Sequence, residues 1–327
     1  MAIPTNTRET YGAVGIREDL SNIIYNISPT ETPFLSGCGR ETAENTYFEW
    51  QTDALTPAAA NRATEGNDPT SSAVQEPVRV GNYTQISVKA VQTSGTAEAV
   101  NFAGRKSSQA YQLAKRAKEM KRDMEKMLMD NVAQSAGAGP SPGPATARAT
   151  AGLGAWVATN YHSLGGAPSP PGLGSASSGN GTDTANDATS TGTLTEAGMK
   201  TVIKECFDSG GTPDTILVGS SNKQVISALT QTVSELRTSA DKSAPAHVVA
   251  SVDVYVSDFG TFKIIPDRFQ RARDCWFIDF DFWAVSYLRP FMTESLARTG
   301  DSIKQMILAE YGLQSKNQAS SGFLADV

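Results

Sequence analysis

The sequence has few of the residues on which reactive and metal-binding sites depend. Its 327 residues include two histidines, His162 and His247, and three cysteines, Cys38, Cys206 and Cys275. The cysteines are odd in number, far apart and without CxxC spacing, which argues against a disulfide framework and against a zinc module. We therefore expect no metal and no cofactor, and we interpret both histidines as surface residues.

Other absences narrow the functional class further. Lysine and arginine number 28 against 34 acidic residues, a net charge of −6, whereas a free nucleic-acid binder normally has a basic excess. No apolar run approaches the ~18 residues of a membrane helix. The N-terminal residues lack the basic start and apolar stretch of a signal peptide, so we expect synthesis in the cytoplasm and no membrane partner. No glycine is followed by lysine, which excludes the P-loop motif.

Acidic pairs are the remaining candidates for chemistry. Asp279 and Asp281 lie two apart in a predicted strand and so on one face, but this spacing is too common to indicate a glycosidase. Asp183 and Asp187 lie in a polar segment without the DxDxDG pattern of a calcium loop. We predict that the protein is not an enzyme, and we keep a hydrolase with a cryptic site as an alternative.

The first 45 residues have the pattern of an arm. Leu20, Ile23, Ile24 and Ile27 fall on one face of a short helix that Pro29 ends. So short a helix needs another surface to cover its apolar face, in the same chain or in a neighbour. Ile23 and Ile24 are therefore candidate contacts between subunits.

Residues 46–100 have the pattern of a long hairpin. Thr46–Asp53 is aromatic, and from residue 78 the even positions are mostly apolar or β-branched, which predicts a strand with one covered face. The polar tip at 54–77 is longer than the usual hairpin loop. Because isolated two-stranded ribbons are marginal in water, we expect this one to dock on a partner. The candidate anchors are Tyr47, Phe48 and Trp50.

The strongest local prediction is a helix over residues 105–134, a stretch without glycine or proline. At 1.5 Å per residue it would be about 45 Å long. Its other faces hold eight basic and four acidic side chains between 105 and 130, a net charge of +4. Spacings of three and four predict one buried apolar stripe, made of Leu113, Ala117, Met120, Met124, Met127 and Leu128.

The remaining chain changes character twice. Residues 137–193 are rich in glycine, proline and serine, and this composition predicts a long loop without a core of its own. From residue 194 the pattern is mixed α/β, with a helix over 195–209, a buried strand at 215–218, a helix over 222–237 and an alternating strand over 248–259. A last strand within 303–327 places Ile307, Ala309, Tyr311 and Leu313 on one face.

The order of these elements, together with several local motifs, resembles the major capsid proteins of tailed bacteriophages. The motifs AYQLAKRAKEMKRDME (110–125), PDTILVGSSNKQVIS (213–227), VDVYVSDFG (252–260), FQRARD (269–274) and WAVSYLRPFMTESLARTGD (283–301) look like the family typified by the SU10 major capsid protein. The resemblance covers nearly the whole chain, except that the segment at 162–192 matches none of these motifs.

This resemblance implies an α+β, Hong Kong 97-like fold. It divides the chain into an N-terminal arm (1–45), an E-loop (46–100), a peripheral-domain spine helix (101–136), a loop or insertion (137–193), an axial domain (194–290) and a peripheral-domain C-terminal strand (291–327).

It also implies a function: self-assembly into hexamers and pentamers that close an icosahedral or prolate head around double-stranded DNA. The implied partners are further copies of the chain and portal, scaffolding and decoration proteins, with the DNA enclosed without sequence-specific binding. Alternatives are an encapsulin-like compartment shell and, in another class, a receptor-binding or decoration protein.

Overall fold

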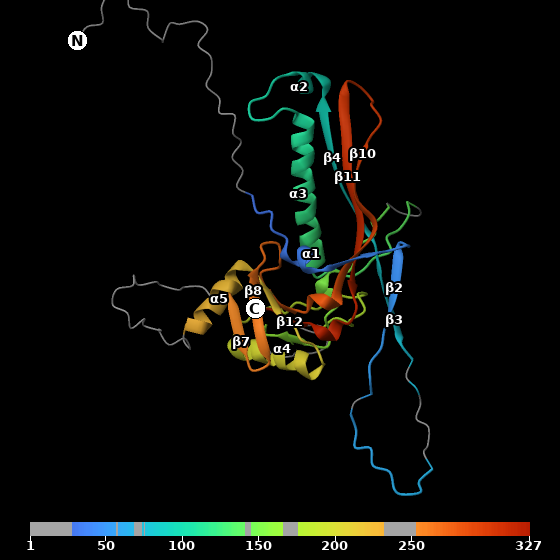
Figure 1. Ribbon diagram of the computed structural model, residues 1–327. Coiled ribbons are helices and arrows are strands. Elements are labelled where there is room, and N and C mark those ends of the chain that lie inside the picture. The colour runs from blue at the N-terminus through green and yellow to red at the C-terminus, as the bar shows by residue number, and fades with distance from the viewer. Residues whose placement is uncertain are drawn as a thin grey trace, which may run out of the picture.

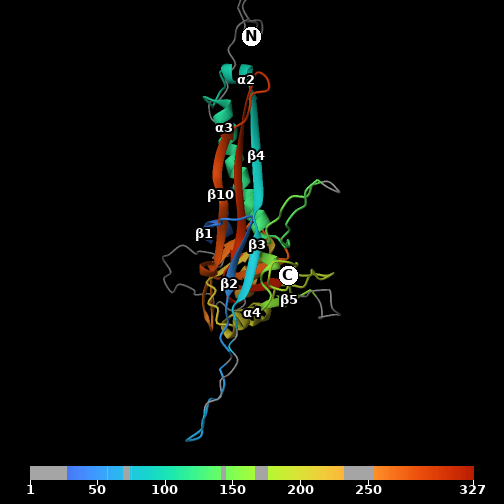
Figure 2. The ribbon, with the colours of Figure 1, turned by 90° about the vertical axis from the view of Figure 1, so that its right-hand side faces the viewer.

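The computed structural model describes residues 28–56, 58–68, 74, 76–140, 145–165, 176–231 and 253–327. They form a tall part, in which a long helix lies along a four-stranded sheet, and a lower part built on a six-stranded sheet (Figure 1). A two-stranded ribbon projects from the junction of the two parts, and Figure 2 shows the same arrangement from the side. Within the described residues no helix has the length and apolarity that crossing a bilayer requires.

The four-stranded sheet has the order β1 (Gly39–Thr42), β10 (Trp283–Ser295), β11 (Ser302–Ser315), β4 (Gln85–Ser94). Strands β10, β11 and β4 are antiparallel neighbours, whereas β1 runs parallel to β10. Two short helices, α1 (Pro33–Gly37) and α2 (Gly95–Ala99), lie at its margins.

Helix α3 (Ser108–Met129) is shorter than the predicted 105–134. Its 22 residues span about 33 Å. The helix begins late because Phe102 and Arg105 form a bridge, with the guanidinium 4.1 Å from the Phe102 ring centroid, and Ser107 then caps the helix. It ends early because the chain at Gly152 crosses so close that a Cβ there would lie 2.1 Å from the Asp130 carbonyl oxygen.

The apolar stripe of α3 faces the sheet. Met120, Met124 and Leu128 are fully buried, while Leu113 and Ala117 are half-buried against the same core cluster. Met127 is only half-buried, and Met129, which the stripe did not include, is buried in its place.

The six-stranded sheet has the order β5 (Tyr161–Ser163), β12 (Gly322–Ala325), β9 (Asp274–Ile278), β6 (Thr215–Val218), β8 (Gly260–Pro266), β7 (Val254–Ser257). Helix α4 (Glu196–Asp208) packs on β12 and follows the predicted span, with the Thr195 hydroxyl accepting from the Gly198 N–H. Helix α5 (Ser220–Gln231) starts two residues before its predicted start, and the rest of that predicted helix lies outside the described residues.

Two predicted segments have a different structure. The 303–327 segment holds two strands in different sheets, because the short helix η4 (Gln318–Ser320) turns the chain from β11 into β12. The described part of 137–193 is not a coreless loop. Its short helix η2 (Leu153–Ala155) and Trp156 are buried in the main core, since the few apolar residues of this segment are clustered rather than spread.

The predicted long hairpin is also divided. Strands β2 (Tyr47–Thr52) and β3 (Val78–Tyr83) pair as the ribbon, but β4 leaves it and pairs with β11. The division falls at the buried Thr84, whose N–H donates to the Thr46 carbonyl at 2.8 Å and whose hydroxyl donates to Glu310 at 3.0 Å. The ribbon therefore ends where the chain enters the body.

Candidate assembly surfaces

Aromatic side chains fix the base of the ribbon to the body. The Trp50 indole N–H donates to the Ser315 carbonyl at 2.7 Å, and its ring lies 5.4 Å from that of Trp156. Phe48 lies 5.7 Å from Trp50 and covers Gly312 of β11 so closely that a Cβ there would be 2.5 Å from its ring. The predicted anchor Trp50 thus contacts its own chain, and Phe48 does the same in part.

Asn82 is a polar link between the ribbon and the body. Its side chain is fully buried, with its amide donating to the Leu313 carbonyl at 2.6 Å and to the Thr150 hydroxyl at 3.0 Å. Its carbonyl oxygen accepts from the Ala151 N–H at 3.0 Å. One side chain of β3 therefore satisfies a backbone carbonyl of β11 and a backbone N–H of the segment before η2. No sequence motif predicts this role.

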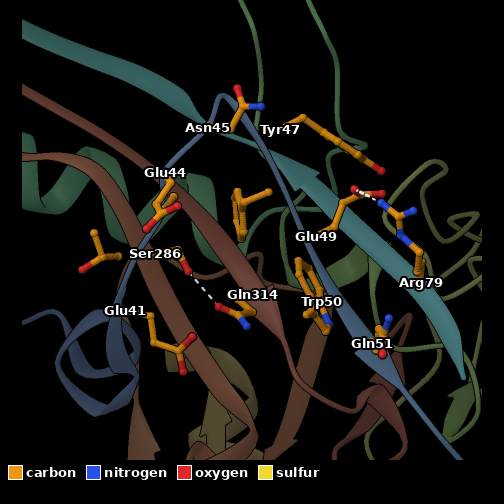
Figure 3. A pocket seen from close by; sticks show the side chains of 13 residues that line it. Glu41, Glu44, Asn45, Tyr47, Glu49, Trp50, Gln51, Arg79, Ser286 and Gln314 are labelled. Carbon is orange, nitrogen blue, oxygen red and sulfur yellow. Dashed lines mark hydrogen bonds and ion pairs between the residues drawn. The ribbon is translucent and has the colours of Figure 1, made fainter.

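An acidic groove of about 550 Å³ lies beside the ribbon base (Figure 3). Glu41, Glu44 and Glu49 line it, together with Ser286 and Gln314 of the sheet, which are hydrogen-bonded to each other at 2.8 Å. Glu41 pairs with Lys316 at 3.0 Å, and Glu49 pairs with Arg79 across the ribbon. The half-exposed Tyr47 lines the same groove, so this predicted anchor can reach another molecule.

The outer face of the long sheet carries exposed apolar side chains. Val88 is 48% exposed and lies in register with Leu308 of β11, which in turn is in register with Met292 of β10, itself 37% exposed. Ile86 extends this row at 46% exposure. We call Ile86, Val88, Leu308 and Met292 the outer row. Leu308 is only 6% exposed between its neighbours, while Ile86, Val88 and Met292 form an apolar strip that the chain itself leaves partly open to solvent.

The outer row shows that the apolar, even-numbered face of β4, predicted to be covered, is not covered by this chain. Helix α3 covers the odd positions, where Lys89 pairs with Asp123 of the helix at 2.6 Å and Ser87 bonds the Tyr311 hydroxyl at 3.3 Å. These two polar side chains are accommodated on the helix-facing side because each has a polar partner, Lys89 on the helix and Ser87 on the neighbouring strand β11. The even, apolar positions consequently point away from the body.

A buried carboxylate holds the lower end of the sheet together. Glu310 is 3% exposed, and it accepts from the Thr84 hydroxyl and pairs with Arg148 and, at 2.8 Å, with Arg289. These contacts join β11 to β10 and to the segment that precedes η2. Removing one partner of such a carboxylate is destabilising, because it leaves a buried charge without compensation.

A second buried carboxylate, Glu125, lies on α3 where the helix meets α1. Its two oxygens accept from the backbone N–H groups of Phe34 and Leu35, each at 2.7 Å. Burial raises its pKa to about 7, with the neighbouring carboxyl of Asp267 adding to the rise. In the sequence, Glu125 is one of four acidic residues on the predicted charged helix. The only sign that it is buried is its position next to Met124 and Leu128 of the apolar stripe.

The histidines and cysteines, which were the candidates for reactive or metal-binding residues, do not form a common site within the described residues. His162 lies in β5 and His247 falls outside the described residues. All three cysteines are buried as free thiols, with burial raising each pKa. Among the described residues no group of three or more His, Cys, Asp or Glu side chains could hold a metal ion.

The acidic pairs have structural roles. Asp279 and Asp281 do not lie in a strand as predicted, because β9 ends at Ile278. Asp279 caps the short helix η3 (Phe280–Phe282) by accepting from the Asp281 N–H at 3.2 Å. Asp187 pairs with Arg271, and Asp183 accepts from the Ser178 N–H at 3.0 Å. The arm contacts Ile23 and Ile24 lie outside the described residues.

Comparison with known proteins identifies the fold. A solved structure described as the cyanophage A-1(L) capsid asymmetric unit superposes with a TM-score of 0.65 at 12% identity, covering 95% of this chain and 97% of that one. The capsid of a native GTA particle superposes with a TM-score of 0.55 at 11% identity, covering 97% and 96%. The fold is therefore that of the Hong Kong 97-like phage capsid proteins, in its α+β form.

Sequence comparison gives the family. A major capsid protein of Escherichia phage Phieco32 is 28% identical over 337 residues, covering 96% of this chain and 95% of that protein. The model of the SU10 major capsid protein family matches residues 3–327. The chain belongs to the SU10 major capsid protein family and is a structural capsid protein of a tailed phage, as the sequence motifs predicted.

Proposed function

We propose that copies of this chain assemble into hexamers and pentamers, which close into a phage head around double-stranded DNA. The family match over residues 3–327 carries the proposal. Two features support it: a ribbon that projects from the body (Figures 1 and 2), and the exposed apolar side chains of the outer row. Many modest contacts of this kind gain strength by repetition in a closed lattice.

In this proposal each part of the chain corresponds to one part of the Hong Kong 97-like capsid fold. The ribbon β2–β3 with its tip is the E-loop, the long sheet with α3 is the peripheral domain, and the six-stranded sheet with α4 and α5 is the axial domain. Residues 1–45 are the arm, with Ile23 and Ile24 as its proposed contacts, and its end joins the peripheral sheet through β1. The E-loop is narrower than 46–100, because β4 belongs to the peripheral sheet.

The charge of the chain fits a container. A net charge of −6 disfavours tight adhesion to phosphates, so the wall would enclose DNA without gripping it. The protein performs no catalysis in this proposal. Its partners are copies of itself with portal, scaffolding and decoration proteins, and the head is built in the host cytoplasm.

A compartment shell is the second candidate. The holo-SrpI encapsulin complex of Synechococcus elongatus superposes with a TM-score of 0.52 at 8% identity, covering 93% of this chain and 92% of that one. This likeness extends to the fold alone. The ratio of ultraviolet absorbance at 260 to 280 nm in particles isolated from infected cells separates the two, since packaged DNA raises it and packaged enzyme does not.

The outer row offers a direct test of assembly. We expect Val88→Lys to leave the free energy of unfolding within about 0.5 kcal/mol of wild type, because the side chain is exposed in the subunit. In a lattice the same lysine would be buried without a partner in every copy, so particles should be lost. Gln92→Lys is the matched control, on the same strand and face at an exposed polar position.

The readout is sedimentation velocity of purified protein under assembly conditions. We expect large particles from wild type and Gln92→Lys and only slow species from Val88→Lys. Particles of normal size from Val88→Lys would show that the outer row is not an assembly contact. Deletion of 54–77 tests the ribbon in the same way, and normal particles from that variant would remove the E-loop assignment.

A further inference from the structure

Three parts of the chain meet at the side chain of Glu125. The residue lies on α3 and is fully buried, and its carboxyl oxygens hold the N–H groups of Phe34 and Leu35 in α1. Its third neighbour is Asp267, the residue directly after β8 of the six-stranded sheet, whose carboxyl group lies close enough to Glu125 to influence its pKa. We call this meeting point the carboxyl joint, made of Glu125, Asp267, Phe34 and Leu35.

Asp267 is held in place by the sheet side of the joint. It is 2% exposed, its backbone N–H donates to the Val218 carbonyl at 2.9 Å, and its Oδ1 accepts from the Phe269 N–H at 2.9 Å. Its Oδ2 is buried and has no donor in the described structure. A buried carboxylate oxygen without a donor is costly. Within the carboxyl joint the Phe34 and Leu35 N–H groups already donate to Glu125, so a proton on Glu125 is the donor left to offer to this oxygen.

The charged groups around the joint leave the two acids unneutralised. On α3, the Arg122 guanidinium lies 5.4 Å from the Phe269 ring centroid. On the sheet side, the backbone N–H of Arg268 donates to Asp267. On the α1 side, the buried Cys38 thiol faces Glu125, and burial, followed by that carboxylate, raises its pKa. Among the described residues, no ion pair is formed by Glu125 or Asp267.

We propose that Glu125 and Asp267 share one proton, and that this proton fastens α1 and α3 to the six-stranded sheet. With the proton present, Glu125 donates to Asp267 Oδ2 while still accepting from Phe34 and Leu35. When the proton leaves to water, two buried carboxylates face each other, and their repulsion opens the joint. The end of the arm is thus attached to the body by a contact that responds to pH.

The direction in which the carboxyl joint responds to pH follows from the raised pKa values of Glu125 and Asp267. Burial raises the pKa of Glu125 from 4.5 to about 7, and burial also raises that of Asp267. A raised pKa means that the closed joint binds the proton more tightly than the open one. The stabilisation is therefore complete below 4.5, falls as the pH rises towards 7, and is lost above it.

Hydrogen exchange of the Phe34 and Leu35 amides in the full-length protein measures the joint directly. After correction for the intrinsic exchange rate, we expect their protection to fall about tenfold per pH unit between pH 5 and 7 and to level off above 7. Asp267→Asn supplies a permanent donor to Glu125 and keeps an acceptor for Phe269. In this variant the protection should fall less steeply with pH, because the repulsion from Asp267 is gone while the burial of Glu125 remains.

Asp279→Asn is the matched control, since it neutralises a different buried aspartate of the lower part whose pKa burial also raises. It should keep the wild-type profile. A flat wild-type profile would overturn the proposal without any variant. Equal slopes in wild type and Asp267→Asn would overturn it as well.

Discussion

Replacing Asn82 with alanine should detach the ribbon from the body. The change removes the amide that bonds the Leu313 carbonyl and the oxygen that accepts from the Ala151 N–H, and both of these residues are fully buried. Each buried backbone group left without a partner costs about 1–3 kcal/mol, so the two together cost about 2–6 kcal/mol. Domains are stable by only about 5–15 kcal/mol, so a loss of this size is large.

Urea unfolding followed by tryptophan fluorescence suits this measurement, because Trp50 and Trp156 lie together at the ribbon base. The control is Asn45→Ala, at an exposed asparagine at the start of the same ribbon that accepts from its neighbour Thr46. We expect the control to change the free energy of unfolding by no more than about 0.5 kcal/mol. If Asn82→Ala costs no more than the control, the ribbon is not held in the way described.

Further changes test other contacts. Gly312→Ala should cost about 1–3 kcal/mol by forcing Phe48 off β11, whereas Gly300→Ala, with open space around it, should be neutral; paired thermal melts compare the two. Glu310→Gln should lower the free energy of unfolding, measured in urea, by about 1–3 kcal/mol. The expected loss is moderate because the partner Arg289 is 44% exposed. A neutral result would show that the contacts of Glu310 with Arg148, Arg289 and Thr84 do not stabilise the fold. Burial raises the pKa of Asp274 from 3.8 to about 7, so its stabilisation is lost as the pH rises between these values. Asp274→Asn should therefore flatten the pH dependence of the melting temperature, and an unchanged slope would refute this.

Local signals were sufficient to locate α3, α4 and one buried strand. The stripe of α3 follows from spacings of three and four, and the Thr195 cap of α4 lies next to the helix it starts. Strand β6 was predicted with its observed bounds because three apolar residues follow the β-branched Thr215, and all four are buried. These features depend on neighbours in sequence, so the sequence alone reveals them.

The phases of two strands could not be predicted in this way. Alternation predicted a covered apolar face for β4 and two unlike faces for β7, yet Val88 is 48% exposed and Val256 of β7 is 73% exposed, while Tyr255 is buried. Alternation shows that a strand has two unlike faces, and it does not show which face the same chain covers. A surface that is completed by another molecule has the same pattern as a core.

Long-range contacts account for the other differences. The polar links of Asn82 and Glu125 join residues at least 68 positions apart, and nothing near them in sequence indicates a partner. The few apolar residues around Trp156 were predicted to lie in a loop without a core, because the segment around them is rich in glycine and serine. Their burial depends on Trp50, more than a hundred residues earlier in the chain.

Cryo-electron microscopy of particles formed by the full-length protein tests the central claim most directly. The account predicts a closed shell of hexamers and pentamers, in which the ribbon of one copy lies against another and Ile86, Val88 and Met292 are covered by a neighbouring subunit. Protein that forms no closed particle, or a shell in which the outer row stays in solvent and the ribbon contacts only its own subunit, would contradict it.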